Sequence, residues 1–221
     1  CIAPPMAPIT EQTALRALCG QLSSQPYVTV DTEFMRDSSY WPKLCLIQLA
    51  APDGTAAAID PTAAGLDLEP LFALLADTRV LKVMHGARQD LEIFFYLSGR
   101  MPKPVFDTQV AAMVCGFGDQ VSYETLVARL TGQRIDKVSR FTDWSKRPLS
   151  EPQLRYALDD VIHLCGVYTK LARRLEESGR ASWVEEEDAL LVDPETYRLD
   201  PETAWHRLKR RSEKPRFLAV L

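Results

Sequence analysis

The sequence predicts an α/β protein in which a mixed β-sheet is flanked by helices. Apolar and β-branched runs at residues 27–34 and 43–50, and a weaker one at 55–59, are joined by short turns and therefore predict antiparallel strands. A further strand is expected at 80–85, with helical periodicity on both sides of it. Early strand pairing followed by alternation of strands and helices is typical of a mixed sheet.

The helices are predicted from apolar residues at helical spacing and from residues that favour helix ends. Ser150 and Gln153 have the spacing of a capping box, so a long helix is expected to begin there. Asp107 stands where an N-cap is expected for the helix that follows it. We expect helices at residues 11–22, 68–77, 88–97, 108–115, 122–131 and 151–177, and a polar loop at 132–149.

The composition excludes several classes of protein. With 221 residues, 46% of them hydrophobic and 25% charged, the chain can bury a sizeable core and is neither disordered nor fibrous in composition. No apolar run approaches the roughly 18 residues that a membrane span needs, so no membrane contact is expected. The formal net charge of -4 argues against binding of polyanions over the whole surface. Any contact with nucleic acid is therefore expected to be local.

The cysteines indicate a reducing compartment. The chain has 5 of them, and no two have the C-x-x-C spacing of zinc sites or redox pairs. Reduced thiols in the cytoplasm are therefore expected. The first residues lack a basic stretch followed by an apolar core, so they do not resemble a signal peptide and look like a cut or processed start.

The composition changes near the carboxyl end, where an acidic stretch gives way to a basic one. Asp200 and Pro201 are suited to start a helix, and Ala204, Trp205 and Leu208 continue it as an apolar series. About twenty residues are too few for a separate core, so we expect them to open another module of a longer protein. The predicted division is a domain at residues 1–180, an acidic linker at 181–200 and the start of a helical module at 201–221.

Two carboxylates interrupt the first predicted strand. Period-two alternation places Asp31 and Glu33 on the same face, where like charges repel unless a cation lies between them. Hard divalent ions with oxygen ligands meet that need. The alternative is a solvent-facing edge of an antiparallel strand.

A third carboxylate follows the strand at 80–85. Asp90 falls in the first turn of the next helix, just after a glycine turn at Gly86. Loops at strand ends often carry functional sites. The alternative is simple stabilisation by the helix dipole, which contributes roughly 0.3 to 1 kcal/mol. His85, at the strand end, is either a substrate contact or a structural histidine.

The long helix after residue 150 carries a further pair. Tyr156 and Asp160 are four residues apart and so lie one turn apart on one face. The neighbouring Asp159 lies near that face too, and periodicity does not decide which aspartate points at a site. The alternative is an ordinary exposed helix surface.

Together these positions resemble a known family. Asp31, Glu33, Asp90 and Asp160, with Tyr156 four residues before the last, resemble the DEDD class of 3′-5′ exonucleases, tyrosine subtype, over about residues 20 to 180. Residues 201–221 are similar to the start of the helical HRDC domain that follows the nuclease there. The stretches most similar to the ribonuclease D family are Asp31-Thr32-Glu33-Phe34, residues 43–48, Phe106-Asp107-Thr108-Gln109, Asp136-Lys137 and residues 142–149.

The resemblance implies a fold and a chemistry. The fold is an RNase H-like mixed sheet of five to six strands, and the four carboxylates are the ligands of two Mg²⁺ or Mn²⁺ ions, with no organic cofactor. Glu33 also lies near the terminal 3′ hydroxyl, and Tyr156 holds the attacking water. A phenol with a pKa near 10 is a poor base at neutral pH, so positioning is the role expected of Tyr156. The implied activity is 3′-5′ exoribonuclease trimming of structured RNA such as tRNA precursors, with release of nucleoside 5′-monophosphates.

Substrate contacts are expected beside the carboxylates and in the polar loop. The loop is locally basic and suited to phosphates. The alternative for Phe34 and Met35 is core packing. For Trp144, the alternative to contact with RNA is that it anchors the loop. The residues expected to touch substrate are Thr32, Phe34, Met35, His85, Lys146 and Arg147, within a basic loop that also includes Arg134, Lys137 and Arg140.

Two other functions stay open from the sequence. A DNA 3′-5′ exonuclease of the same subtype would use the same carboxylates, because discrimination at the 2′ hydroxyl depends on pocket shape. An inactive exonuclease fold could instead serve as a docking module for RNA or protein. The complete set of four carboxylates and Tyr156 counts against an inactive fold.

Overall fold

A mixed five-stranded sheet lies at the centre of the computed structural model, which describes residues 7–36, 41–135 and 142–198. The strand order is β3-β2-β1-β4-β5; β1 pairs antiparallel with β2, and parallel with β4. The early strands pair antiparallel, as predicted, and the parallel pairs of β4 with β1 and β5 make the sheet mixed. The strands are β1 (Tyr27–Met35), β2 (Lys43–Ala50), β3 (Ala56–Ile59), β4 (Leu81–Met84) and β5 (Val105–Asp107).

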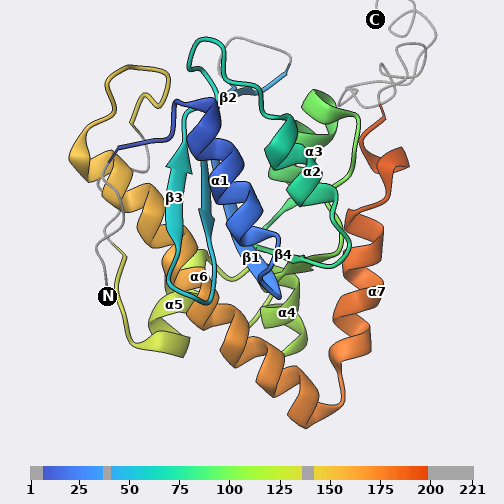
Figure 1. Cartoon of the computed structure of the whole chain (residues 1–221). Helices are drawn as coiled ribbons and strands as arrows, with labels where there is room; N and C mark the ends of the chain where they lie inside the picture. Colours follow the sequence, from blue (N-terminus) through green and yellow to red (C-terminus); the bar gives the residue numbers. More distant parts are fainter. Residues whose placement is uncertain (1–6, 37–40, 136–141, 199–221) are drawn as a thin grey trace, which may run out of the picture.

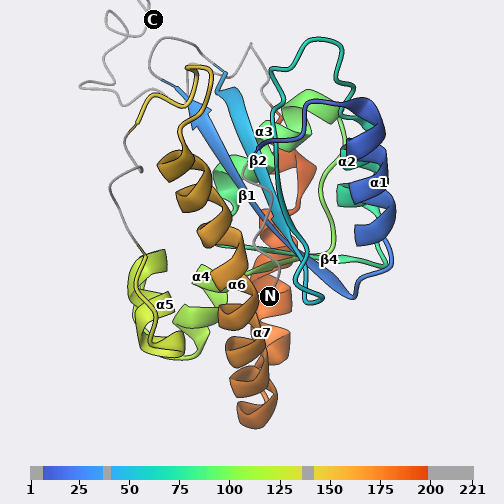
Figure 2. The same cartoon turned by 60° about the vertical axis from the view of Figure 1, so that its left-hand side comes forward.

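Helices cover both faces of this sheet. Figure 2 shows α1 and α2 on one side of the strands and α5 and α6 on the other. Figure 1 shows α7 running beside the sheet, next to α4. The helices are α1 (Gln12–Leu22), α2 (Glu69–Ala76), α3 (Arg88–Ser98), α4 (Thr108–Val114), α5 (Tyr123–Thr131), α6 (Glu151–Ser178) and α7 (Ala181–Leu191), and a 3₁₀ turn follows at Pro194–Thr196.

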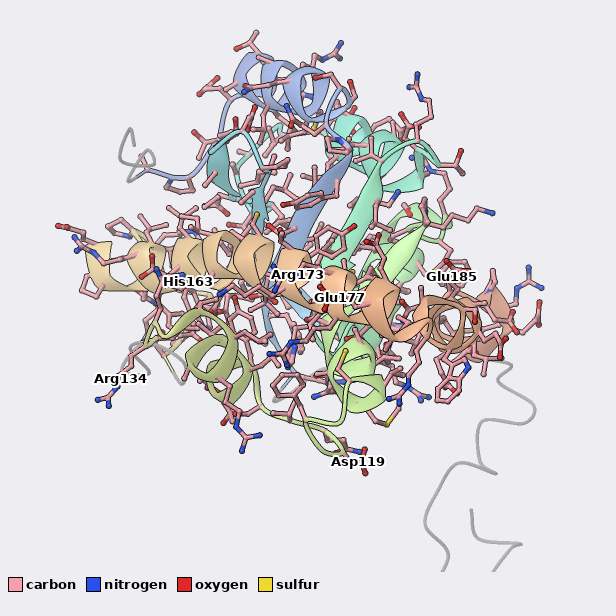
Figure 3. The ribbon with its side chains drawn as sticks, turned by 90° about the horizontal axis from the view of Figure 1, so that it is seen from below. Asp119, Arg134, His163, Arg173, Glu177 and Glu185 are labelled. Carbon is pink, nitrogen blue, oxygen red and sulfur yellow. The ribbon has the colours of Figure 1, made fainter. Side chains whose placement is uncertain are left out.

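The long helix α6 crosses the sheet. The predicted capping box at Ser150 and Gln153 is present at its start, and Gly179 ends it in the left-handed conformation with φ 66°. Its inner side is apolar, and its outer side is charged. On the outer side, Arg173 Nε lies 3.4 Å from Glu177 Oε1, one turn away (Figure 3).

The central strand β1 is fixed to α6 by a buried hydrogen bond. Thr29 Oγ1 donates to the backbone oxygen of Val161 over 2.8 Å. Since Thr29, Asp31 and Glu33 alternate onto one face of β1, this bond sets the face that carries the carboxylates against the helix.

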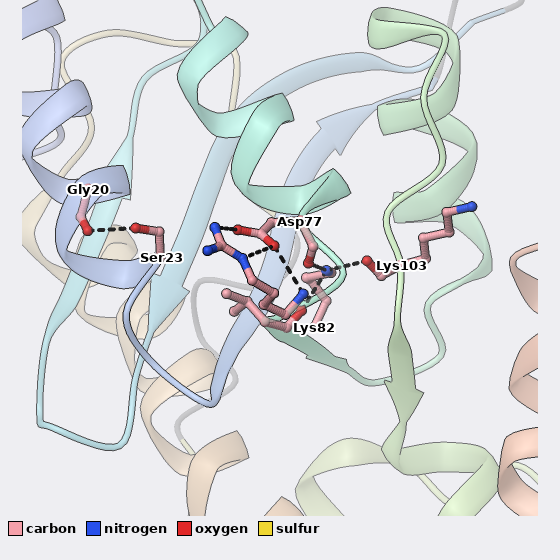
Figure 4. A network of polar contacts seen from close by, with 7 residues as sticks. Gly20, Ser23, Asp77, Lys82 and Lys103 are labelled. Carbon is pink, nitrogen blue, oxygen red and sulfur yellow. Dashed lines mark hydrogen bonds and ion pairs between the residues drawn. The ribbon is translucent and has the colours of Figure 1, made fainter.

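The core is divided by the sheet. One large apolar cluster lies between the sheet and α1, α2 and α3, and two smaller clusters lie under α4, α5 and α6. Lys82, on β4, is fully buried, and its Nζ donates to the backbone oxygens of Asp77 (2.8 Å), Val80 (2.6 Å) and Lys103 (2.5 Å), as Figure 4 shows. The ammonium group thus joins the loop before β4 to the segment before β5.

Two elements depart from the sequence prediction. Residues 181–191, expected as part of an acidic linker, form the helix α7 instead, because Val184 packs into the cluster under α4 and α6 while the glutamates face outward. The strand β5 was not predicted, since three residues carry too little periodicity. The predicted module at 201–221 lies outside the described residues. Among the described helices, none is long and apolar enough to cross a membrane.

Candidate active site

Three carboxylates converge where β1 meets α6. One ligand oxygen from each of Asp31, Glu33 and Asp160 lies within 4.8 Å of the other two. The first two project from the same face of β1, as alternation predicts, and Asp160 reaches them from the buried side of α6. The structure therefore favours Asp160 over the neighbouring Asp159 as the aspartate of this site.

Asp90 lies beside this group but outside it. It stands in the first turn of α3, is 7% exposed and accepts a hydrogen bond from Thr32 Oγ1. The turn that leads to it contains Gly86, whose φ of 64° favours glycine. The strand-to-helix turn therefore delivers Asp90 to the edge of the sheet next to Asp31.

The buried carboxylate of Asp107 holds that turn. Its two oxygens accept hydrogen bonds from the backbone N–H groups of Gly86 (2.9 Å) and Ala87 (2.8 Å). One of them also accepts from the N–H of Gln109 (2.8 Å), which confirms Asp107 as the N-cap of α4. A single side chain therefore connects the starts of α3 and α4.

The carboxylates hold their protons more tightly than free aspartates. Burial raises the pKa of Asp31 to about 6, and a backbone hydrogen bond from Thr32 opposes this shift. Burial, and then the charge of Asp31, raise the pKa of Asp160 to about 8 and that of Asp90 well above its usual value. A bound cation would reverse this repulsion and lower all three pKa values.

Tyr156 completes the group. Burial, followed by the charges of Asp160 and Glu33, raises the pKa of its hydroxyl above the usual value of a phenol. A hydrogen bond from this hydroxyl lowers the pKa of Asp160. Tyr156 is thus a neutral donor to the carboxylate one turn further along α6, as its i, i+4 spacing predicts.

A cavity of about 370 Å³ opens onto these side chains. Asp31, Tyr156 and Asp160 form one wall, and the start of α5 forms another. No lysine or arginine lies among the described residues of the lining. The lining residues are Val30, Asp31, His85, Gln109, Gln120, Ser122, Tyr123, Glu124, Tyr156, Asp160 and Leu164.

The donor set suits a hard divalent cation. Carboxylate oxygens are the ligands that Mg²⁺ and Mn²⁺ prefer. Asp160 Oδ1 is buried and has no hydrogen-bond partner among the described residues, although buried acceptors are normally satisfied. A cation beside Asp31 and Glu33 would satisfy this oxygen and offset the repulsion among the carboxylates.

Comparison with known proteins agrees with this arrangement. A family profile described as 3′-5′ exonuclease matches residues 6–176. The chain belongs to this exonuclease family. The predicted resemblance to ribonuclease D is also confirmed: the chain is 57% identical over 213 residues to "Ribonuclease D" of Granulibacter bethesdensis, and the match covers 96% of this chain and 54% of that protein. The chain thus spans about half the length of the ribonuclease D relatives it matches.

Solved structures have the same fold. Escherichia coli RNase D, described as an exoribonuclease involved in structured RNA processing, superposes with a TM-score of 0.85 at 36% identity, and the match covers 90% of this chain and 52% of that one. Brucella melitensis NrnC with bound Mg²⁺ superposes with a TM-score of 0.72 at 29% identity, covering 87% and 93% of the two chains. The predicted RNase H-like sheet flanked by helices is therefore confirmed.

Three of the expected substrate contacts are on β1, and the structure gives each another role. The Thr32 side chain is buried at 6% exposure and donates to Asp90, because alternation turns it away from the face of Asp31. Phe34 and Met35 are partly buried and pack against two apolar clusters. Core packing, the alternative from the sequence, describes these two residues in the structure.

Arg147 serves the fold of the chain instead of reaching into the cavity. Its guanidinium donates to both oxygens of Asp60, at 2.6 and 2.8 Å, and to the backbone oxygens of Cys45, Trp144 and Lys146. These contacts use its donors, so the predicted phosphate contact is replaced by a structural one. Trp144 is buried against α6, as the alternative reading expected.

Lys146 and His85 differ in their access to the site. Lys146 is exposed and lies 3.5 Å from Asp143, whereas His85 lines the cavity with its Nδ1 3.0 Å from Thr108 Oγ1. Burial lowers the pKa of His85. Lys137 and Arg140 lie outside the described residues.

Sequence reasoning missed the wall formed by α5. Ser122 caps this helix through a hydrogen bond from the N–H of Thr125, and Tyr123 and Glu124 follow it into the lining. The sequence marks a helix start here, but nothing in it indicates that this start faces the carboxylates. Only the packing of α5 against α6 brings them together.

Proposed function

We propose that the chain is a metal-dependent 3′-5′ exoribonuclease of the ribonuclease D type. It removes 3′-terminal nucleotides from structured RNA such as tRNA precursors and releases nucleoside 5′-monophosphates. The observation that carries the proposal is the convergence of Asp31, Glu33 and Asp160 within 4.8 Å, with Tyr156 bonded to Asp160, in a chain of the 3′-5′ exonuclease family. We also place the enzyme in the cytoplasm, on the grounds of its scattered cysteines.

The ligands of the proposed ions come from two sides of the site. The four carboxylates of Asp31, Glu33, Asp90 and Asp160 would hold the divalent cations. Mg²⁺ or Mn²⁺ suits such a set, and the Mg²⁺ bound by Brucella NrnC supports the assignment. When bound, these cations supply Lewis-acid activation of water and stabilise the attacking and leaving oxygens.

The residues of the chain orient the reacting groups. The Tyr156 hydroxyl donates a hydrogen bond to Asp160, so its oxygen lone pairs can accept a hydrogen bond from the attacking water. Because its pKa is raised, Tyr156 stays neutral and positions the water without removing its proton. Glu33 would orient the terminal 3′ hydroxyl. Attack at phosphorus then breaks the bond to the 3′ oxygen of the preceding nucleotide.

A digestion ladder tests the proposal. A 5′-labelled single-stranded RNA is incubated with Mg²⁺ or Mn²⁺, with and without EDTA, beside a DNA strand of matched sequence and the Asp31→Asn variant. Metal-dependent shortening from the 3′ end, absent in the variant, is the expected result. Preference for the DNA strand would contradict the assignment to RNA.

The docking alternative predicts a different result. A fold that only binds RNA or protein would leave both strands intact under every ion. Calorimetric titration of the metal-free protein with Mg²⁺ then separates the alternatives, because a docking module has no need of the ion. If the chain neither cleaved RNA nor bound Mg²⁺, the nuclease proposal would be rejected in favour of a docking function.

A further inference from the structure

The start of α5 contacts the helix turn that carries Asp160. The hydroxyl of Tyr123, the first residue of α5, donates a hydrogen bond to the backbone oxygen of Asp160. The Tyr123 ring lies against His85, with ring centroids 5.2 Å apart. Both residues line the cavity that holds Asp31 and Tyr156. Tyr123 therefore contacts the active site from the wall formed by the start of α5.

This bond lies at one end of a continuous contact between α5 and α6. At the other end, Lys170 Nζ donates to the backbone oxygen of Leu130 over 2.6 Å. Between the two bonds, Leu126 and Val127 of α5 pack with Leu164 of α6 in one buried cluster. Figure 2 shows the two helices side by side on the same face of the sheet. The hydroxyl of Tyr123 is thus the polar contact at the active-site end of this interface.

Few other contacts hold the Asp160 carboxylate. Its Oδ1 has no hydrogen-bond partner among the described residues, and Tyr156 is the hydrogen-bond donor to the side chain. The position of the carboxylate consequently depends on the backbone that carries it. A carbonyl oxygen only accepts hydrogen bonds, so the Tyr123 hydroxyl must donate to that backbone.

The hydroxyl is suited to a permanent donor role. Burial, and then the charges of Asp160 and Asp31, raise the pKa of Tyr123 well above the usual value. The phenol is therefore neutral over the working range of a nuclease.

We propose that Tyr123 is a positioning residue, which holds the Asp160 turn of α6 in the place where the carboxylate can bind a divalent cation. The inference rests on the proposed function, since it concerns the same metal site. Groups that orient metal ligands without touching the ion typically change metal affinity or activity by 10- to 100-fold when they are removed. Tyr123 has this relation to Asp160.

The test removes one hydroxyl and compares it with a matched control. Tyr123→Phe keeps the ring against His85 and deletes the donor. Tyr197→Phe deletes a hydroxyl that also donates to a helix backbone oxygen, that of Leu191 at 2.7 Å, and neither residue lines the cavity. Calorimetric titration of each metal-free protein with Mg²⁺ is the primary measurement, with thermal unfolding as a check of the fold.

The expected result separates the two variants. Tyr123→Phe should bind Mg²⁺ roughly 10-fold more weakly than the unmodified chain, while Tyr197→Phe should bind it with unchanged affinity and lose a comparable amount of stability. In the digestion assay, excess Mg²⁺ should restore much of the rate of Tyr123→Phe, and its KM for RNA should not change.

Two outcomes would overturn the inference. One is equal Mg²⁺ affinity of the folded Tyr123→Phe variant and the unmodified chain, and the other is an equal loss in Tyr197→Phe. Intact RNA with the unmodified chain, together with weaker Mg²⁺ binding by Tyr123→Phe, would reject the proposed function and support the positioning role. The digestion assay and the titration therefore test the two proposals separately.

Discussion

Asp160 has a buried carboxylate oxygen without a hydrogen-bond partner among the described residues, and it lines the same cavity as Asp31 and Tyr156. Without a cation, its charge is repelled by Asp31 and is unfavourably solvated. Such a group is costly for folding and useful for catalysis, because the same arrangement attracts a metal ion. The roles of the site residues can therefore be tested by their opposite effects on stability and turnover.

Asp160→Asn should abolish turnover and stabilise the metal-free protein by on the order of 1 kcal/mol, since it removes one of the mutually repelling charges. Turnover on 5′-labelled RNA and urea unfolding in EDTA measure the two effects. Asp159→Asn is the matched control on the next position of α6 and should cut normally. If Asp159→Asn were inactive and Asp160→Asn active, the assignment along this helix would be wrong.

Tyr156→Phe should slow hydrolysis by roughly 100-fold, because the attacking water loses the group that orients it. Mg²⁺ affinity should change far less, since the phenol is not a ligand. Single-turnover digestion at saturating Mg²⁺ measures the rate, and calorimetry measures the affinity. A variant with normal rate would show that the water is oriented by another group.

Among the helices, α3 and α4 share one support. The carboxylate of Asp107 caps α4 and also accepts the N–H groups of Gly86 and Ala87, just before α3. Since α3 carries Asp90, the geometry of the site depends on a side chain that does not line the cavity. The sequence predicted Asp107 as an N-cap. Its hydrogen bonds with Gly86 and Ala87 could not be predicted in the same way, because they depend on the pairing of β4 with β5.

Asp107→Ala should destabilise the fold by about 2–3 kcal/mol, because it removes a helix cap and leaves buried N–H groups without an acceptor. It should also lower turnover through displacement of Asp90. Thermal unfolding and the digestion assay measure these changes. Asp193→Ala removes the exposed cap of the 3₁₀ turn and should cost much less; equal losses in both variants would reject the special role of Asp107.

Local patterns predicted the parts of the site that follow from a single element. Alternation along β1 paired Asp31 with Glu33, and helical spacing paired Tyr156 with Asp160. The family resemblance added Asp90, since no local pattern connects it to the others. Arg147 was expected to contact phosphate, and its ion pair with Asp60 was not predicted because Asp60 lies 87 residues away in the sequence. Long-range contacts of this kind leave no periodic signal.

Over the chain as a whole, α7 extends the domain beyond its predicted end at residue 180. Asp188 of this helix is 5% exposed and accepts a hydrogen bond from the N–H of Asp107, at 3.1 Å. An acidic run suggested a linker, yet its charges fall on the outer side while Val184 and Asp188 are buried. Charge composition alone did not distinguish a packed helix from an exposed connection.

The buried Asp188 predicts a pH dependence of stability. Burial raises its pKa to about 8, above the 3.8 of an unperturbed aspartate, so the folded chain retains a proton that the unfolded chain releases. Protonated Asp188 therefore contributes fully to the free energy of unfolding below pH 4, and this contribution is lost as the pH rises to about 8, with a change on the order of 5 kcal/mol.

Asp188→Asn should remove this pH dependence, because an amide does not titrate, and should be more stable than the unmodified chain at pH 8. Urea unfolding between pH 5 and 9 measures the difference. Glu186→Gln, at an exposed position of the same helix, should leave the pH dependence unchanged. Parallel curves for Asp188→Asn and the unmodified chain would show that Asp188 does not titrate as expected.

The network around Lys82 makes this lysine an internal reporter of unfolding. Burial lowers its pKa to about 8, and the fully buried amine is closed to reagents while the core stays folded. Acylation by an amine-reactive ester, followed by mass spectrometry, should label the exposed Lys146 at once and Lys82 only as the core opens. Early labelling of Lys82 would mean that the β4–β5 region opens separately. Labelling in step with urea unfolding would make one native amine a measure of how often the entire domain opens.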